Sequence, residues 1–132
     1  MIVSATINIV NYIGGVILKQ VGVISAQVID ILGLNVSPDT PIFLSDSNIE
    51  HMQTVHESAY NRYGDLIEEI IAHPTYVGYK KGAIEYVKEV SEYVKVAVRV
   101  SSDNLYFART LYTINPDKVE RFVAKGTLFS LT

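Results

Sequence analysis

Two of the three histidines in the chain, His51 and His56, stand five residues apart in a segment predicted to be helical. Imidazole is the side chain whose unperturbed pKa, about 6.5, lets it accept and donate protons near neutral pH. The C-terminal half that follows reads as a sheet rich in Lys and Arg. Together these residue types could cleave a phosphodiester bond without a metal ion. The alternative is ordinary helix packing with no catalysis.

The spacing of the two histidines complicates this interpretation. Five residues on a straight helix turn through about 140°, so both rings reach one atom only if the helix begins late or bends. His56 shares its predicted face with Met52 and Val55, whereas His51 lies at the edge of that face. A histidine on an apolar helix face is more often structural than catalytic. From the residues alone, His56 is therefore a packing residue or a site residue.

Arg109 is the most notable cation. It falls on the predicted core face of its strand with Phe107 and Leu111, where an unpaired guanidinium would be costly. It must meet a carboxylate, such as that of Glu85 or Glu50, or open onto a cleft. A structural ion pair and a phosphate contact remain nearly equal alternatives.

Other side chains of the C-terminal half could also hold a phosphate group. Lys95 and Arg99 alternate on the outer face of one predicted strand, where a solvated edge is the commoner explanation. Lys81 lies in a turn, and turn lysines are usually solvated. Thr110 could donate a hydrogen bond to a phosphate oxygen. We count Lys81, Lys95 and Arg99 as candidate phosphate contacts, and Thr110 as a candidate catalytic residue beside Arg109.

Composition restricts the classes of protein. A chain of 132 residues, 48% of them hydrophobic, suffices for one compact domain. The net charge of −3 and the pI of about 5.5 differ from the strong positive charge of proteins that coat nucleic acid, so RNA would have to meet a local basic patch. The chain has no cysteine, which excludes disulfides and thiolate chemistry. Neither a zinc-ligand spacing nor a phosphate-binding glycine loop is present, and we expect no cofactor.

The elements that would position these residues follow from periodicity. A capping box at Ser47 and Glu50 predicts that the histidine helix begins near Asn48. The order of helices first and an antiparallel meander afterwards predicts an α+β fold, with N-terminal helices on a four-stranded antiparallel sheet and a C-terminal helix. Helices are expected at residues 26–32, 48–60, 66–72 and 117–125, and strands at residues 42–44, 75–79, 84–88, 93–101 and 105–114.

The first 22 residues are rich in Ile and Val, and we interpret them as a strand-like extension ahead of a domain at residues 23–132. Asn8, Asn11 and Lys19 interrupt the apolar run, so it predicts neither a membrane span nor a signal peptide. Gly14 and Gly15 separate two β-branched stretches, which favours a strand pair. We expect a cytoplasmic protein with no membrane contact, in which the N-terminal strand could mediate self-association.

Residues 23–129, roughly four-fifths of the chain, resemble the phage and mobile-element nuclease domains of the barnase/EndoU/colicin/RelE-like (BECR) superfamily. The motifs occur in the order of the family pattern, although each alone would be weak. They are Ile24-Ser25, Val28-Ile29, Leu32-Gly33, Ser47-Asn48-Ile49, His51, His56, Ile70-Ile71, Pro74, Val77 and Phe107-Ala108-Arg109-Thr110-Leu111.

The resemblance implies a metal-independent endoribonuclease, a toxin or effector of a phage or integrative element, that cleaves RNA by attack of the 2'-hydroxyl. It favours His51 as catalytic residue and His56 as its positioning partner. RNA, with tRNA as one candidate, and an immunity or antitoxin protein are the implied partners. A catalytically silent module of the same fold, binding RNA or protein, stays open, and the acidic pI slightly favours it. A third alternative is a structural domain that pairs through its N-terminal strand.

Overall fold

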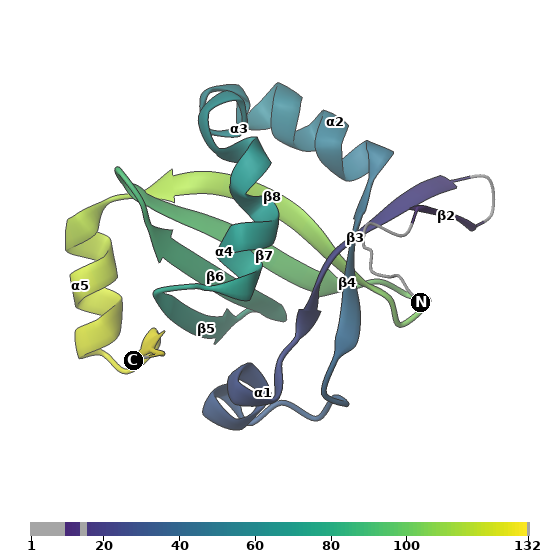
Figure 1. Ribbon diagram of the computed structural model, residues 1–132. Coiled ribbons are helices and arrows are strands. Elements are labelled where there is room, and N and C mark those ends of the chain that lie inside the picture. The colour runs from purple at the N-terminus through teal and green to yellow at the C-terminus, as the bar shows by residue number, and fades with distance from the viewer. Residues whose placement is uncertain (1–9, 14–15, 132) are drawn as a thin grey trace.

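The computed structural model describes residues 10–13 and 16–131. An eight-stranded mixed sheet forms the centre of this part of the chain, with helices on both of its faces (Figure 1). The α+β class is confirmed. The helices are α1 (Ala26–Leu32), α2 (Asp46–Val55), α3 (Glu57–Tyr63), the 3-10 helix η1 (Gly64–Leu66), α4 (Ile67–Ala72) and α5 (Pro116–Ala124).

The strands follow the order β2-β3-β4-β8-β7-β6-β5-β9 across the sheet. All described pairs are antiparallel except that of β4 with β8. The bounds are β2 (Val10–Ile13), β3 (Val16–Ile24), β4 (Thr40–Ser45), β5 (Tyr76–Lys80), β6 (Ala83–Glu89), β7 (Tyr93–Val100), β8 (Tyr106–Ile114) and β9 (Phe129–Ser130).

The predicted four-stranded sheet was wrong in its extent. The meander β5 to β8 is present, but β4 adds to it in parallel, with Ile42 opposite Tyr106 and Phe43 opposite Phe107. β3 and β2 extend that side, and β9 pairs with β5 on the other. A parallel pair between segments so distant in sequence leaves no local signal. β3 crosses the boundary that we expect between residues 22 and 23, and residues 1–9 lie outside the described part.

The two faces of the meander are covered differently. Tyr86, Val96 and Leu111 point into the main core beneath the helices on the side of α4, and each is fully buried. Because side chains alternate along a strand, Val87 and Ile114 point the other way. There they pack under α5 and the segment after it, together with Val119, Leu128, Tyr76, Tyr93 and Phe122.

This second packing covers only one end of its face. The rest, which we call the open face, carries Glu85 of β6, Lys95 and Arg99 of β7, and Thr110 and Tyr112 of β8. Register places these residues on one side of the sheet, since Lys95 lies opposite Tyr112 and Ala97 opposite Thr110. α2 and α3 run beside β8 at the border of this face (Figure 1).

A β-bulge in β8 corrects the expected orientation of Arg109. Ala97 pairs with Thr110 and Val98 with Ala108, so Arg109 between them is the extra residue. Phe107 and Leu111, expected on one face, therefore point to opposite faces. Arg109 itself is exposed rather than directed to the core.

The histidine helix also differs from the expectation. Ser45, not Ser47, caps α2, and its reciprocal partner is Asn48, so the helix begins at Asp46. It ends at Val55, and His56 leaves helical geometry with φ −124° and ψ 43° before α3 begins. The single helix predicted over residues 48–60 is therefore two helices joined at His56.

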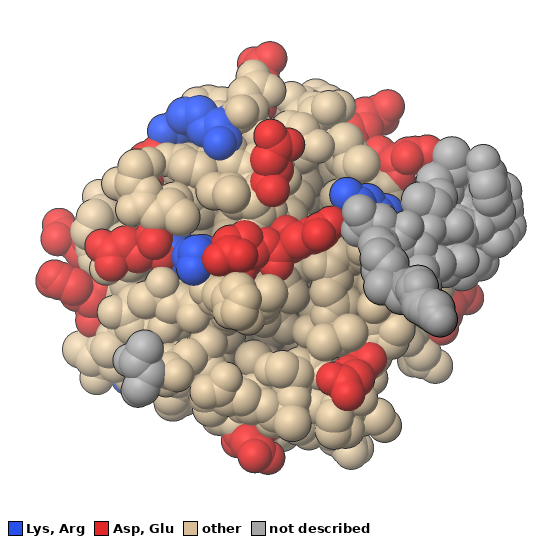
Figure 2. Space-filling model, viewed as in Figure 1, with Lys and Arg blue, Asp and Glu red and all other residues tan. Residues whose placement is uncertain are grey.

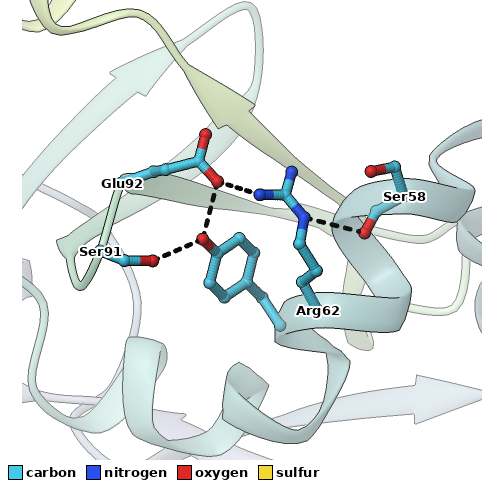
Figure 3. Close-up of polar contacts among 5 residues, drawn as sticks. Ser58, Arg62, Ser91 and Glu92 are labelled. Atoms are coloured by element: carbon cyan, nitrogen blue, oxygen red, sulfur yellow. Dashed lines mark hydrogen bonds and ion pairs between the residues drawn. The ribbon is translucent and has the colours of Figure 1, made fainter.

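α3 is tied to the connection between β6 and β7 (Figure 3). The hydroxyl of Tyr63, a buried residue, lies 2.8 Å from Ser91 Oγ and donates to Glu92 Oε2 at 2.7 Å. Arg62 forms an ion pair with the same carboxylate and donates to the carbonyl of Ser58. The hydrogen bond from Tyr63, together with Arg62, lowers the pKa of Glu92 despite its partial desolvation.

No helix within the described ranges has the length and apolarity needed to cross a bilayer.

Candidate active site

The break at His56 brings the two histidines together. The ring centroids of His51 and His56 lie 5.7 Å apart, with the rings nearly perpendicular at 76°. On an unbroken helix the two side chains would diverge by about 140°. His51 is exposed and His56 is half-buried, so both rings remain within reach of a ligand.

Tyr112 continues this cluster onto the open face. Its ring stacks on His56 at 5.4 Å between centroids and 27° between planes. Lys95 Nζ lies 5.0 Å from the centroid of the same ring and donates to Glu85 Oε2 at 2.9 Å. A continuous series of contacts therefore links His51 to Glu85.

Lys95 corrects the expectation of a solvated edge lysine. It is only 7% exposed, and its ion pair with Glu85 has side-chain exposures of 9% and 14%. Burial alone would lower the pKa of Lys95, but hydrogen bonds with Tyr112 and Glu85, together with the negative charge of Glu85, outweigh burial and raise it. Lys95 is therefore a fixed cation beneath Tyr112.

The environment of His56 favours the neutral imidazole. Burial lowers its pKa, and the neighbouring His51 lowers it further. A neutral imidazole at neutral pH can accept a proton. Thr110 stands two residues before Tyr112 and faces the same side of the sheet.

Arg109 lies in a separate pocket of about 300 Å³ at the start of α2. Ser47 and Asn48 of the helix, Asp103 of the β7–β8 connection and Phe107 also line this pocket. Among the described residues Arg109 has no ion pair, so the structural ion pair considered from the sequence is absent there. Glu85, one of its two expected partners, is bound by Lys95 instead.

Two predicted phosphate contacts lie away from the histidines. Arg99 donates to the carbonyl of Lys81 at 2.7 Å, and both residues are exposed. Lys81 adopts a positive φ of 52° in the turn between β5 and β6. The described contacts do not join either residue to the histidine cluster.

Sequence reasoning missed Tyr112 and Glu85 as members of the cluster. Tyr112 was interpreted as sheet packing, and Glu85 only as a partner for Arg109. The alternation of Thr110 with Tyr112 could have pointed to the tyrosine. The bulge that sets this alternation has no signal in the sequence.

Charge is distributed unevenly over the surface. On the side of α4, many Asp and Glu side chains surround few Lys and Arg (Figure 2). Lys19, Arg62 and Lys88 each form an ion pair with a glutamate, namely Glu68, Glu92 and Glu69. In the described part of the chain no three His, Asp or Glu side chains gather as a metal site.

Fold and site together define an α+β domain whose partly open sheet bears a cluster of ionisable side chains. The family model described as phage-Barnase-EndoU-ColicinE5/D-RelE like nuclease3 matches residues 19–121, more than half of the chain. The chain belongs to this family of nuclease-like domains, which confirms the resemblance found in the sequence. No curated protein and no solved structure gave a match.

Proposed function

We propose that the protein is a metal-independent endoribonuclease that cleaves RNA through attack of a 2'-hydroxyl on the adjacent phosphorus. The observation that carries this proposal is the contact between the rings of His51 and His56 at the border of the open face, where His56 also stacks on Tyr112. Two imidazoles at this distance can serve as a base and an acid on opposite sides of one phosphate. Membership of a nuclease-like family supports the same reaction class.

The lowered pKa of His56 assigns the roles in this proposal. Neutral His56 accepts the proton of the 2'-hydroxyl, whose oxygen forms a bond to phosphorus. The bond from phosphorus to the 5'-oxygen breaks, and protonated His51 supplies the proton to that oxygen. The products are a 2',3'-cyclic phosphate and a 5'-hydroxyl, with no metal-bound water involved.

Nearby donors would stabilise the charge that builds on the phosphate oxygens. Tyr112 and Thr110 face the same side as the histidine cluster, and the ammonium of Lys95, paired with Glu85, lies beneath Tyr112. Arg109, exposed in the pocket beside α2, would hold a flanking phosphate. Lys81 and Arg99 lie further off and would contact RNA outside the reacting nucleotides.

Incubation of the purified protein with total RNA in EDTA tests the reaction. We expect cleavage that leaves 2',3'-cyclic phosphate ends, and its loss in His51→Ala and His56→Ala. Strict dependence on Mg²⁺ or Mn²⁺ would sink the mechanism.

A catalytically silent RNA-binding module is the second candidate. Lys95 is already neutralised by Glu85, and the net charge of −3 is unusual for an RNA-cleaving enzyme. Salt-sensitive RNA binding without cleavage would favour this module over the nuclease.

The biological setting is part of the proposal. A role as toxin or effector of a phage or integrative element, acting on RNA such as tRNA in the cytoplasm, fits a family of phage nuclease-like domains. An immunity or antitoxin protein would then be a partner. β2, the last described strand on its side of the sheet, offers an edge for self-association. Toxicity on expression that His51→Ala relieves would support the toxin role.

A further inference from the structure

A second pocket of about 410 Å³ adjoins the histidine cluster on the side of α5. It shares Lys95 and Tyr112 with the cluster and extends to Asn115, Lys118 and Phe122. Lys80 of β5 also lines it. The pocket therefore starts at the proposed reaction site and continues between α5 and the sheet.

The pocket is lined by three lysines, of which Lys95 is paired with Glu85 while Lys80 and Lys118 keep their charges available. None of its lining residues is Asp or Glu. In the described part of the chain Lys80 and Lys118 have no ion pair, unlike Lys19 and Lys88 on the side of α4. Lys80 Nζ lies 4.9 Å from the centroid of the Phe122 ring, which positions the ammonium without neutralising it.

β8 connects the two pockets through the cluster. Arg109 lines the pocket at its bulge, Tyr112 meets His56, and Asn115 lines the second pocket just beyond its end. Six residues of extended strand span about 20 Å. An RNA strand that follows β8 would pass all three places in turn.

We infer that the pocket between α5 and the sheet binds a backbone phosphate of single-stranded RNA next to the cleaved bond, through Lys80 and Lys118. This inference rests on the proposed function and names its substrate class. The rings of Tyr112 and Phe122 line the same pocket, with His56 and Lys95 on the faces of Tyr112 and Lys80 over Phe122. Only an unpaired base can pack against the remaining edges of these rings. A duplex would keep its bases away from both rings.

Binding of a 2'-O-methyl RNA oligonucleotide tests this subsite apart from catalysis, because such RNA lacks the attacking hydroxyl. Lys118→Ala and Lys80→Ala are compared with Lys19→Ala, which removes the same charge from the side of α4. We expect each pocket variant to weaken binding about three- to tenfold and to flatten the dependence of log K on log salt by about 0.7. The control should bind like the unaltered protein. A hairpin of the same composition should bind less well than the single strand.

The outcomes separate this inference from the nuclease proposal. If Lys118→Ala and Lys80→Ala bind as Lys19→Ala does, or if the hairpin binds equally well, the subsite is wrong even when the protein cleaves RNA in EDTA. If the expected losses occur but nothing is cleaved, the subsite stands and the nuclease proposal fails. A protein that binds neither RNA contradicts both.

Discussion

His56 owes its properties to the point where α2 stops. The residue ends one helix and precedes the next, with a backbone outside helical geometry. Its ring therefore meets both His51 and Tyr112. The lowered pKa of its imidazole follows from burial and from the neighbouring histidine.

The influence of His51 on His56 can be measured in His51→Gln. Loss of the neighbouring charge should raise the pKa of His56 toward its ordinary value of 6.5, although burial still holds it lower. NMR titration of the His56 ring checks this, and an unchanged pKa would contradict the coupling. Cleavage should fall about 10²- to 10⁴-fold in the same variant.

The lowered pKa of His56 also makes the stability of the protein depend on pH. The unfolded chain binds the proton more tightly, so this contribution is fully present above pH 6.5 and is lost as pH falls through the lowered pKa. His56→Gln should remove that part of the pH dependence, while His51→Gln should retain most of it because burial is the larger cause.

Arg109 can be tested by keeping its charge while changing its shape. Arg109→Lys should fold normally and lose most cleavage activity, because a single ammonium cannot hold two phosphate oxygens as a guanidinium does. Arg109→Met should fold equally well, since the arginine is exposed and has no described ion pair. Thermal unfolding and RNA affinity are the measurements. Unaltered affinity in both variants would remove Arg109 from the site.

The buried pair of Lys95 and Glu85 should respond differently to single and double substitution. Glu85→Gln leaves the lysine without its counter-charge and should lower the free energy of unfolding by about 2 kcal/mol. Lys95→Met combined with Glu85→Gln should be milder than the sum of the single changes. The double-mutant cycle compares the unaltered protein, Glu85→Gln, Lys95→Met and the double variant by urea unfolding. Simple additivity of the changes in the free energy of unfolding would show that the pair is not coupled.

At the scale of elements, α3 is held where its tyrosine and arginine reach the β6–β7 connection. Tyr63 brings a buried ring with a bonded hydroxyl, and Arg62 adds a surface ion pair to the same carboxylate, that of Glu92 (Figure 3). Because His56 directly precedes α3, this attachment also fixes one side of the histidine junction.

Tyr63→Phe tests the attachment. The variant loses both hydroxyl contacts and should be less stable by about 1 to 2 kcal/mol at neutral pH. The pKa of Glu92 is lowered in the folded protein, so its contribution is present above its ordinary value near 4.5 and is lost as pH falls. The difference between the two proteins should therefore shrink in acid. Equal differences at pH 7 and pH 3, measured by urea unfolding, would contradict this account.

Local signals predicted elements better than their assembly. The helices expected at residues 26–32 and 117–125 match α1 at both ends and α5 within one residue at each end. Their limits depend on a few neighbouring residues, with Ser25 and Gly33 capping α1 and Asn115 capping α5. The break at His56 was not predicted, since no proline or glycine marks it. The sheet partners of β4 and the bulge at Arg109 depend on distant strands, so the orientation of Arg109 and the burial of Lys95 could not be read locally.

At the scale of the whole molecule, the two sides of the sheet differ in how they are packed and in how their charges are paired. The side of α4 holds the main core and an outer surface in which its cations are paired with glutamates. The other side holds a smaller core at one end and the polar cluster at the other. An acidic protein can thus present a local cationic path, as the net charge of −3 requires of an RNA-binding protein.

Hydrogen exchange with bound 2'-O-methyl RNA should reveal this division. We expect slower exchange in the turn from β8 into α5 and at the α2–α3 junction, where RNA would cover the backbone. Amides of α4 should exchange at an unchanged rate. Protection of α4 without protection near α5 would show that RNA binds on the side of α4 and would contradict binding on the open face.

The bulge in β8 lets this strand hold one residue more than its partner without turning over the surface that follows. Because Arg109 is left out of the pairing, Thr110 still lies opposite Ala97, and Tyr112 stays on the open face. If residue 109 took a regular paired position, every side chain after it would change sides, with Tyr112 turned inward and Leu111 outward. Deleting residue 109 would instead keep Ala108 opposite Val98 and Thr110 opposite Ala97, so the way the strand accommodates its extra residue decides which groups can meet a ligand.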